Sequence, residues 1–116
     1  MANLISRLFG KTAEPGWLTT DELAIRLTEA VPPLLIDVRG PGEYHGPLGH
    51  IEEAVNIPLD QFAEHTAELT AETRRVVLVC HTDRRSYAAA QHLRANGMTE
   101  VAVLRGGMTA WRSEGR

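Results

Sequence analysis

The sequence predicts an α/β domain with a small, mostly parallel sheet of about five short strands flanked by helices. Short runs of apolar, often β-branched residues alternate along the chain with segments of helical pattern, which is typical of parallel sheets. The clearest run, residues 76–79, is apolar throughout, as expected of a strand buried on both faces. A chain of 116 residues supports one domain with a single core.

The chain is expected to begin with an extension that precedes the domain. Residues 1–14 predict a flexible or amphipathic N-terminal extension, and residues 15–116 predict the folded domain. The extension has no apolar run long enough for a signal peptide. Pro15-Gly16 marks a turn, and Trp17-Leu18 then predicts an edge strand.

The first helix is predicted by a capping box. Thr19 and Glu22 have the spacing at which each side chain can bond the other residue's backbone N–H. Pro32-Pro33 is expected to end this helix, because the residue before a proline avoids the helical conformation. Residues 34–38 predict the next strand.

The segment before the central strand is less regular. Gly40-Pro41-Gly42 predicts a turn, and residues 43–51 predict at most one helical turn. Residues 54–57 predict a short strand, which Pro58 closes. One or two short helices are then expected around three apolar residues, Leu59, Phe62 and Leu69.

A helix is predicted over residues 87–95, after the central strand. Ser86 is the candidate cap at its start, and Gly97 stands where a C-terminal glycine belongs. Residues 101–104 predict the last strand, which Gly106-Gly107 ends. A closing helix is expected over residues 108–113, with Trp111 facing inward.

Cys80, the only cysteine, stands at the end of the central strand and faces the start of the predicted helix. Unpaired N–H groups and the helix dipole favour an anion there. Arg84 and Arg85 add two positive charges, which further favour a reactive thiolate. The alternative is a structural cysteine, but a core cysteine usually lies inside an apolar run.

Composition limits the other classes of function. The net charge of −3 argues against a nucleic-acid surface. One cysteine excludes an internal disulfide and a cysteine-based zinc site, and the five histidines have no zinc-type spacing, so we expect no metal and no cofactor. No apolar run approaches the ~20 residues of a transmembrane helix. These features predict a reduced, cytoplasmic protein.

Three charged residues upstream of Cys80 are candidates for structural roles near the site. Asp37 and Arg39 follow the predicted strand at 34–38 and are expected to form an ion pair or a loop anchor. Glu43 is expected either to pair with an arginine near the site or to remain a solvated carboxylate at a helix start.

Four motifs between Trp17 and Trp111 together resemble the single-domain rhodaneses, a family of sulfurtransferases. In order they are Asp37-Val38-Arg39 with Glu43-Tyr44, Gly49-His50-Ile51 with Ala54 and Asn56-Ile57-Pro58, the loop from Cys80 to Ser86, and Gly106-Gly107-Met108 with Ala110-Trp111. Each motif is weak alone, but four in the family's order make a specific match. The resemblance implies a three-layer rhodanese-like domain.

The resemblance also implies a mechanism. Cys80 would attack the outer sulfur of thiosulfate or a persulfide and become a persulfide itself. The outer sulfur of this persulfide would then pass to cyanide or a thiol, with a protein as a further candidate acceptor. The backbone N–H groups of the loop would hold the anionic sulfur. The implied substrate-binding residues are His81, Thr82, Asp83, Arg84, Arg85 and Ser86.

The loop departs from the family at Asp83, where many members have glycine. Aspartate tolerates a positive φ at modest cost, if that position requires one. Its charge opposes a thiolate and a divalent donor, so we expect activity with a preference other than thiosulfate. Arg84 and Arg85 more than offset this charge formally.

Two other functions compete with sulfur transfer. Cysteine-loop phosphatases and arsenate reductases place five residues between the cysteine and the arginine, whereas Cys80 and Arg85 have four between them. A non-catalytic module that binds a partner would not need a cysteine here. A module that carries sulfur to one dedicated partner is the alternative to a general sulfurtransferase.

Overall fold

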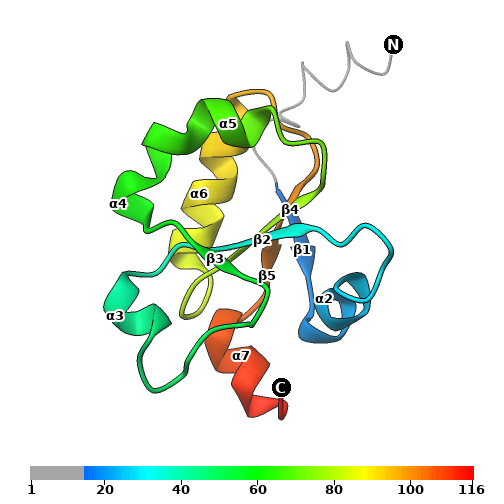
Figure 1. The fold of residues 1–116 in the computed structure, drawn as a ribbon, viewed down its shortest axis with the longest axis vertical. Coiled ribbons are helices and arrows are strands. Elements are labelled where there is room, and N and C mark those ends of the chain that lie inside the picture. The colour runs from blue at the N-terminus through cyan, green and yellow to red at the C-terminus, as the bar shows by residue number, and fades with distance from the viewer. Residues whose placement is uncertain (1–14) are drawn as a thin grey trace.

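The computed structural model describes residues 15–116, so the predicted extension at residues 1–14 lies outside the described residues. Five strands form one sheet in the order β1-β5-β4-β2-β3 (Figure 1), and every neighbouring pair is parallel. The strands are β1 (Gly16–Leu18), β2 (Leu34–Asp37), β3 (Val55–Asn56), β4 (Val76–Val79) and β5 (Val101–Leu104). The predicted α/β fold and its parallel sheet are confirmed, with β1 at one edge as expected.

Helices cover both faces of the sheet and make three layers. One face carries α4 (Leu59–Phe62), the 3₁₀ turn η1 (Ala63–His65), α5 (Thr66–Thr70) and α6 (Arg84–Ala95). The other face carries α2 (Thr20–Arg26) and α7 (Gly107–Ser113) (Figure 1). The short helix α3 (Pro41–Tyr44) follows β2. None of the helices within residues 15–116 is long and apolar enough to span a membrane.

The central strand β4 is buried on both faces, as its apolar sequence predicts. Val76 and Leu78 belong to the core beneath α6, whereas Val77 and Val79 belong to the core beneath α2 and α7. Successive side chains of a strand alternate between faces, so Cys80 continues the row on the α6 face, in the same core cluster as Leu78. The alternation therefore places the thiol at the carboxyl edge of the middle strand.

Helix α2 has the predicted start and a different end. Thr19 and Glu22 form the expected capping box, in which each side chain accepts the other's backbone N–H. The helix ends at Arg26 and not at Pro32-Pro33, so the predicted end is wrong. The Thr28 hydroxyl and N–H both donate to the Ile25 carbonyl, and this tight turn replaces the next helical bonds.

Two other boundaries differ from the expectation. The predicted turn at residues 40–42 is the start of α3, with Pro41 in the first helical position, where its missing N–H costs nothing. Helix α6 begins at Arg84 rather than at residue 87, and Asp83 occupies the N-cap position predicted for Ser86. Gly97 ends α6 as predicted, with φ of +96°.

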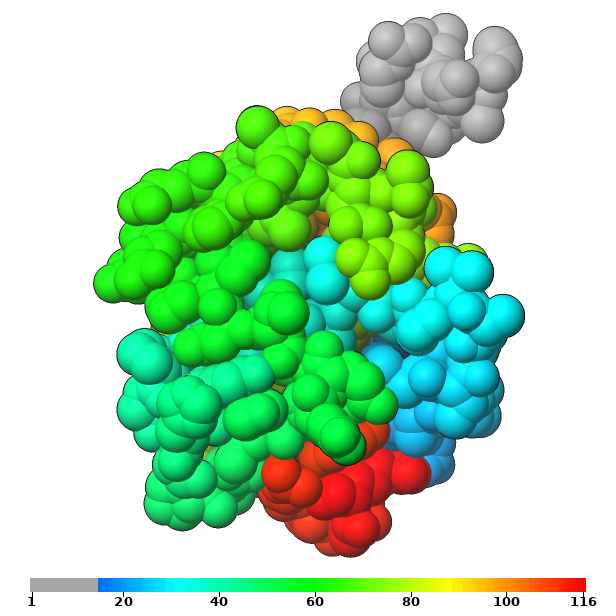
Figure 2. Space-filling model, in the orientation of Figure 1, coloured from blue at the N-terminus to red at the C-terminus, as the bar shows by residue number. Residues whose placement is uncertain are grey.

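The segment between α3 and β3 is held against the closing helix α7. Arg112 donates from Nε to the Leu48 carbonyl at 2.8 Å and from Nη2 to the His50 carbonyl at 3.2 Å. Figure 2 shows the two parts of the chain in contact at the surface, where the red of α7 meets the green of the segment. Trp111 is buried beside them, as expected.

Candidate active site around Cys80

A cavity of about 450 Å³ opens at the carboxyl edge of the sheet, above the end of β4. Its lining contains four of the predicted loop residues together with Cys80, which is only 1% exposed. The lining residues are Leu59, Cys80, His81, Thr82, Arg84, Arg85 and Ala88. Ligands of open α/β sheets bind in the crevice at this edge, so the cavity is the candidate active site.

The Cys80 sulfur is held by one residue, Ser86, which is fully buried behind it. The Ser86 backbone N–H donates to Sγ at 3.4 Å, and the Ser86 Oγ lies 3.2 Å from Sγ. The same hydroxyl also lies 3.2 Å from the Asp83 carbonyl oxygen. A hydroxyl has one proton to donate. When Cys80 is a thiol, its S–H can donate to the Ser86 Oγ while the Ser86 hydroxyl donates to the Asp83 carbonyl. When Cys80 is a thiolate, the Ser86 hydroxyl can donate to Sγ instead.

Helix α6 supplies this contact from its first turn. Ser86 is the third residue of the helix, and N–H groups in that turn have no partner within the helix. They carry the positive end of the helix dipole. The early start of α6 therefore turns Ser86 from the expected cap into a direct partner of the sulfur.

The opposite side of the loop is bound by the start of α7. The Met108 N–H donates to the Cys80 carbonyl at 2.9 Å, and the Thr109 N–H donates to the His81 carbonyl at 3.1 Å. Gly107 makes this approach possible, because a Cβ there would lie 2.2 Å from the Thr82 carbonyl oxygen and 2.4 Å from that of Cys80. Its φ of +55° also favours glycine.

Arg85 lines the cavity and is bound by Glu43 of α3. Its Nη1 and Nη2 donate to the two carboxylate oxygens at 2.7 and 2.9 Å. The Arg85 hydrogen bonds lower the pKa of Glu43 to about 2, although partial burial opposes the shift. The same pair raises the pKa of Arg85. Of the two expectations for Glu43, the structure shows the ion pair with an arginine.

Asp37 and Arg39 form a buried ion pair beside the cavity and do not line it. Both side chains are at most 1% exposed, and the Arg39 Nη2 lies 2.8 Å from Asp37 Oδ2. The Arg39 Nη2 also donates to the Gly49 carbonyl. Asn56 donates to the carbonyls of Asp37 and Arg39. The pair thus anchors the ends of β2 and β3 next to β4.

Asp83 and Arg84 complete the loop. Asp83 has φ of −151°, so the position needs no left-handed backbone, and aspartate there carries no such strain. Arg84 is exposed and lines the cavity. No carboxylate within residues 15–116 lies at ion-pair distance from Arg84.

Sequence reasoning missed two apolar lining residues and one contact. Leu59 was expected only in a short helix and Ala88 only within α6, yet both line the cavity. The contact of α7 with the loop carbonyls was not predicted, although the Gly106-Gly107 pair signals a close approach of two backbone segments. The described part of the chain holds no group of three residues that could bind a metal ion.

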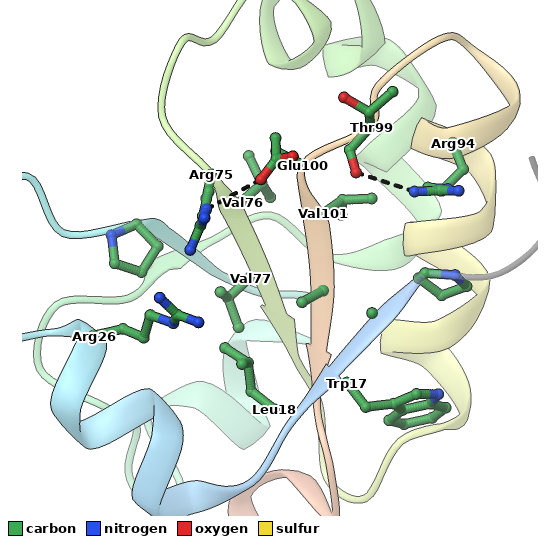
Figure 3. A pocket seen from close by; sticks show the side chains of 14 residues that line it. Trp17, Leu18, Arg26, Arg75, Val76, Val77, Arg94, Thr99, Glu100 and Val101 are labelled. Carbon is green, nitrogen blue, oxygen red and sulfur yellow. Dashed lines mark hydrogen bonds and ion pairs between the residues drawn. The ribbon is translucent and has the colours of Figure 1, made fainter. Parts of the chain in front are cut away.

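A second cavity, also of about 450 Å³, lies at the amino ends of β4 and β5 (Figure 3). Arginines 26, 75 and 94 line it, but Arg75 is paired with Glu100 at 3.1 Å and Arg94 donates to the Thr99 carbonyl. Among the described residues, no cysteine or histidine lines it. This second cavity is therefore a weaker candidate for a catalytic site than the cavity at Cys80.

Comparison with known proteins identifies the family. The model of the rhodanese-like domain matches residues 19–114. YqhL of Bacillus subtilis is 47% identical over 77 residues, which are 66% of this chain and 59% of that protein. The thiosulfate sulfurtransferase GlpE of Shewanella oneidensis is 31% identical over 87 residues, which cover 75% of this chain and 83% of GlpE.

A solved structure shows the same fold. The crystal structure of a rhodanese-like domain protein from Staphylococcus aureus superimposes with a TM-score of 0.72 at 34% identity, covering 83% of this chain and 90% of that one. The motifs, the parallel sheet and the family match agree with one another. The chain belongs to the rhodanese-like domain family.

Proposed function

We propose that the protein is a sulfurtransferase, which moves sulfane sulfur from thiosulfate or a persulfide to cyanide or a thiol through a persulfide on Cys80. The observation that carries this proposal is the position of the lone cysteine. Its sulfur lies at a cavity at the carboxyl edge of the sheet, where the Ser86 N–H and hydroxyl can stabilise a thiolate. A buried structural cysteine would need neither the cavity nor these donors.

The reaction has two balanced steps. The Cys80 thiolate attacks the outer sulfur of the donor, the bond between the donor's two sulfurs breaks, and its electron pair leaves with the remainder, which is sulfite when the donor is thiosulfate. The acceptor then attacks the sulfur carried by Cys80, and the thiolate returns. The Ser86 donors and the first turn of α6 offset the negative charge in both states.

The remaining loop residues have secondary roles in this proposal. His81, Thr82 and Arg84 line the cavity and would contact the donor, while Arg85 orders the entrance through Glu43. Asp37, Arg39 and Glu43 hold the surrounding backbone. Because Cys80 must be a free thiol between turnovers, we place the reaction in a reducing, cytoplasmic compartment.

The direct test is the intact mass of the protein after brief exposure to thiosulfate or to glutathione persulfide. A gain of one sulfur atom, about 32 Da, that cyanide or dithiothreitol removes is expected. The Cys80→Ser variant should keep its fold and gain nothing. Sulfur uptake by that variant would refute the nucleophile, and no uptake by the wild type would leave a binding module. Sulfur that loads but passes only to a protein acceptor would identify a dedicated carrier.

A further inference from the structure

We propose that the Glu43–Arg85 ion pair makes this site select an organic persulfide over thiosulfate as its sulfur donor. The inference rests on the proposed function and names the donor within it. It follows from the hydrogen bonds between Arg85 and Glu43, from the balance of charge around Cys80 and from the apolar part of the cavity wall.

Arg85 lines the same cavity as Cys80, but the Nη1–Nη2 edge of its guanidinium is not free to bind an anion. Both of its terminal nitrogens donate to Glu43, at 2.7 and 2.9 Å. A sulfonate group is best held by two parallel N–H donors of a guanidinium, and on Arg85 the pair formed by Nη1 and Nη2 is already occupied by Glu43. Thiosulfate would have to displace a carboxylate that α3 holds in place through the Gly40 N–H.

The charges around Cys80 cancel before any donor arrives. Three arginines, at 39, 84 and 85, are matched in number by three carboxylates, at 37, 43 and 83, and two of the arginines, Arg39 and Arg85, are paired with Asp37 and Glu43. Ionisation of Cys80 then gives the site a net negative charge. Thiosulfate carries two negative charges, whereas an organic persulfide with an uncharged R group carries no charge as R–S–SH and one as R–S–S⁻, so it is repelled less.

The cavity offers an organic group more than it offers thiosulfate. Leu59 of α4 and Ala88 of α6 give it an apolar side. Its volume of about 450 Å³ falls in the range of sites for small organic ligands. The carbon atoms of R can bury against Leu59 and Ala88, a contribution that an inorganic donor cannot make.

The transfer itself balances without a further reactant. The Cys80 thiolate forms a bond to the outer sulfur of R–S–SH, and the bond between the two donor sulfurs breaks. The electron pair leaves on R–S⁻, which takes a proton from water. The proton on the transferred sulfur stays with it until it is lost to solvent.

The test compares how fast Cys80 gains sulfur from each donor, by intact mass, in the wild type and in two charge-matched variants. Glu43→Gln frees Arg85 and adds one positive charge to the site. Glu72→Gln is the matched control, because Glu72 forms the same two-pronged pair with Arg74 at the other end of β4. Its pKa is also lowered to about 2, by the Arg74 hydrogen bonds.

The wild type should load at least about tenfold faster from benzyl persulfide, whose R group is apolar and uncharged, than from thiosulfate. Glu43→Gln should raise loading from thiosulfate relative to loading from the persulfide about five- to tenfold, as expected for one charge acting on a dianion at short range. Glu72→Gln should change neither rate. If Glu43→Gln fails to fold, Asp83→Asn adds the same charge and should shift the preference in the same direction.

An unchanged ratio of the two rates in a folded Glu43→Gln variant would overturn the inference, and so would a wild type that prefers thiosulfate. Either result would leave the proposed sulfurtransferase standing, because Cys80 would still have loaded. If no protein gained sulfur from either donor, the proposed function itself would be wrong.

Discussion

The Ser86 hydroxyl lies within hydrogen-bond distance of two atoms, the Cys80 sulfur and the Asp83 carbonyl oxygen, and it can donate its proton to either. Removing it leaves the N–H contact to Cys80 intact, so the backbone of α6 need not move. A thiolate left with one donor instead of two is less stable. In the proposed reaction Ser86 is therefore a positioning and charge-stabilising residue for Cys80, and its effect should appear in the ionisation of the sulfur.

We predict that Ser86→Ala lowers the fraction of Cys80 present as thiolate at neutral pH, and slows sulfur loading about tenfold, as the loss of one hydrogen bond to a charged group implies. Thiolate absorbance near 240 nm measures the first effect. Ser113→Ala removes a hydroxyl that bonds a helix carbonyl at the surface and should change neither quantity. Equal thiolate absorbance in Ser86→Ala and the wild type would contradict the role.

Asp83 and Ser86 show why single residues in the loop were hard to place from the sequence. Both are good helix caps, and only the number of residues between β4 and α6 decides which of them takes that position. Four residues, 80–83, lie between β4 and α6, so the N-cap position falls on Asp83 and Ser86 faces the sulfur. The identity of Cys80 as the candidate nucleophile needed only its position after an apolar strand.

At the scale of elements, the β4–α6 loop is held between two helix starts. Helix α6 offers an N–H group to the sulfur, and α7 offers N–H groups to the loop carbonyls of Cys80 and His81. The loop therefore presents its two sides to different helices. Gly107 is the point at which α7 comes closest to it.

We predict that Gly107→Ala reduces the free energy of unfolding by at least about 3 kcal/mol, because its Cβ would overlap three carbonyl oxygens. Gly97→Ala is the matched control: φ is also positive there, but nothing lies within 4 Å of the added Cβ. Gly97→Ala should lower the free energy of unfolding only by the backbone strain of a positive φ, about 1–2 kcal/mol. Denaturant titration measures both, and equal costs would show that the close approach is not rigid.

The Glu43–Arg85 pair links α3 to α6, and it should contribute to stability in a defined pH range. The folded pKa of Glu43, about 2, lies below its ordinary value of 4.5. A depressed pKa contributes stability above the ordinary value, and this is lost as pH falls through the folded one. The difference in unfolding free energy between the wild type and Glu43→Gln should therefore be constant above about pH 5 and shrink toward pH 2. A difference that does not change over this range would contradict the pairing.

Elements were easier to predict than their ends. The strands follow from short apolar runs, and the capping box fixed the start of α2. The end of α2 was misplaced by several residues, because the Thr28 hydroxyl competes with the helix for the Ile25 carbonyl. Such competition is local and weak, so the two prolines offered a stronger but misleading signal.

At the scale of the whole molecule, Asp37 and Arg39 stand out because they form the one ion pair within residues 15–116 whose two side chains are both buried. It joins the ends of β2 and β3, and Arg39 reaches the Gly49 carbonyl. Removing one partner of a buried pair leaves the other charge without compensation. The cost should therefore appear in the stability of the entire sheet and not only at the site.

We predict that Asp37→Asn lowers the unfolding free energy by about 3–5 kcal/mol, measured by urea titration. Glu100→Gln breaks the exposed pair with Arg75 and should cost less than about 1 kcal/mol. A double change of Asp37→Leu with Arg39→Met should recover part of the loss, since no charge is then left buried. A small effect of Asp37→Asn would show that water reaches Arg39.

The layers of the molecule could be predicted from the sequence, but the relations between distant segments could not. Glu43 and Arg85 are 42 positions apart, and nothing local joins them. The same holds for Leu59, whose apolar side chain fits a core helix as well as a cavity wall. Only the order of the strands brings α3, α4 and α6 to one edge.

That order also sets when the site can exist. Strand β1 pairs with β5, and the loop at Cys80 takes its carbonyl partners from α7. A ribosome synthesises α7 after Cys80, so a nascent chain that has already exposed Cys80 still lacks the segment that shapes its loop. Long separations of this kind also slow folding. The loop at Cys80 therefore takes its final shape only after the start of α7, residues 107–109, has been synthesised.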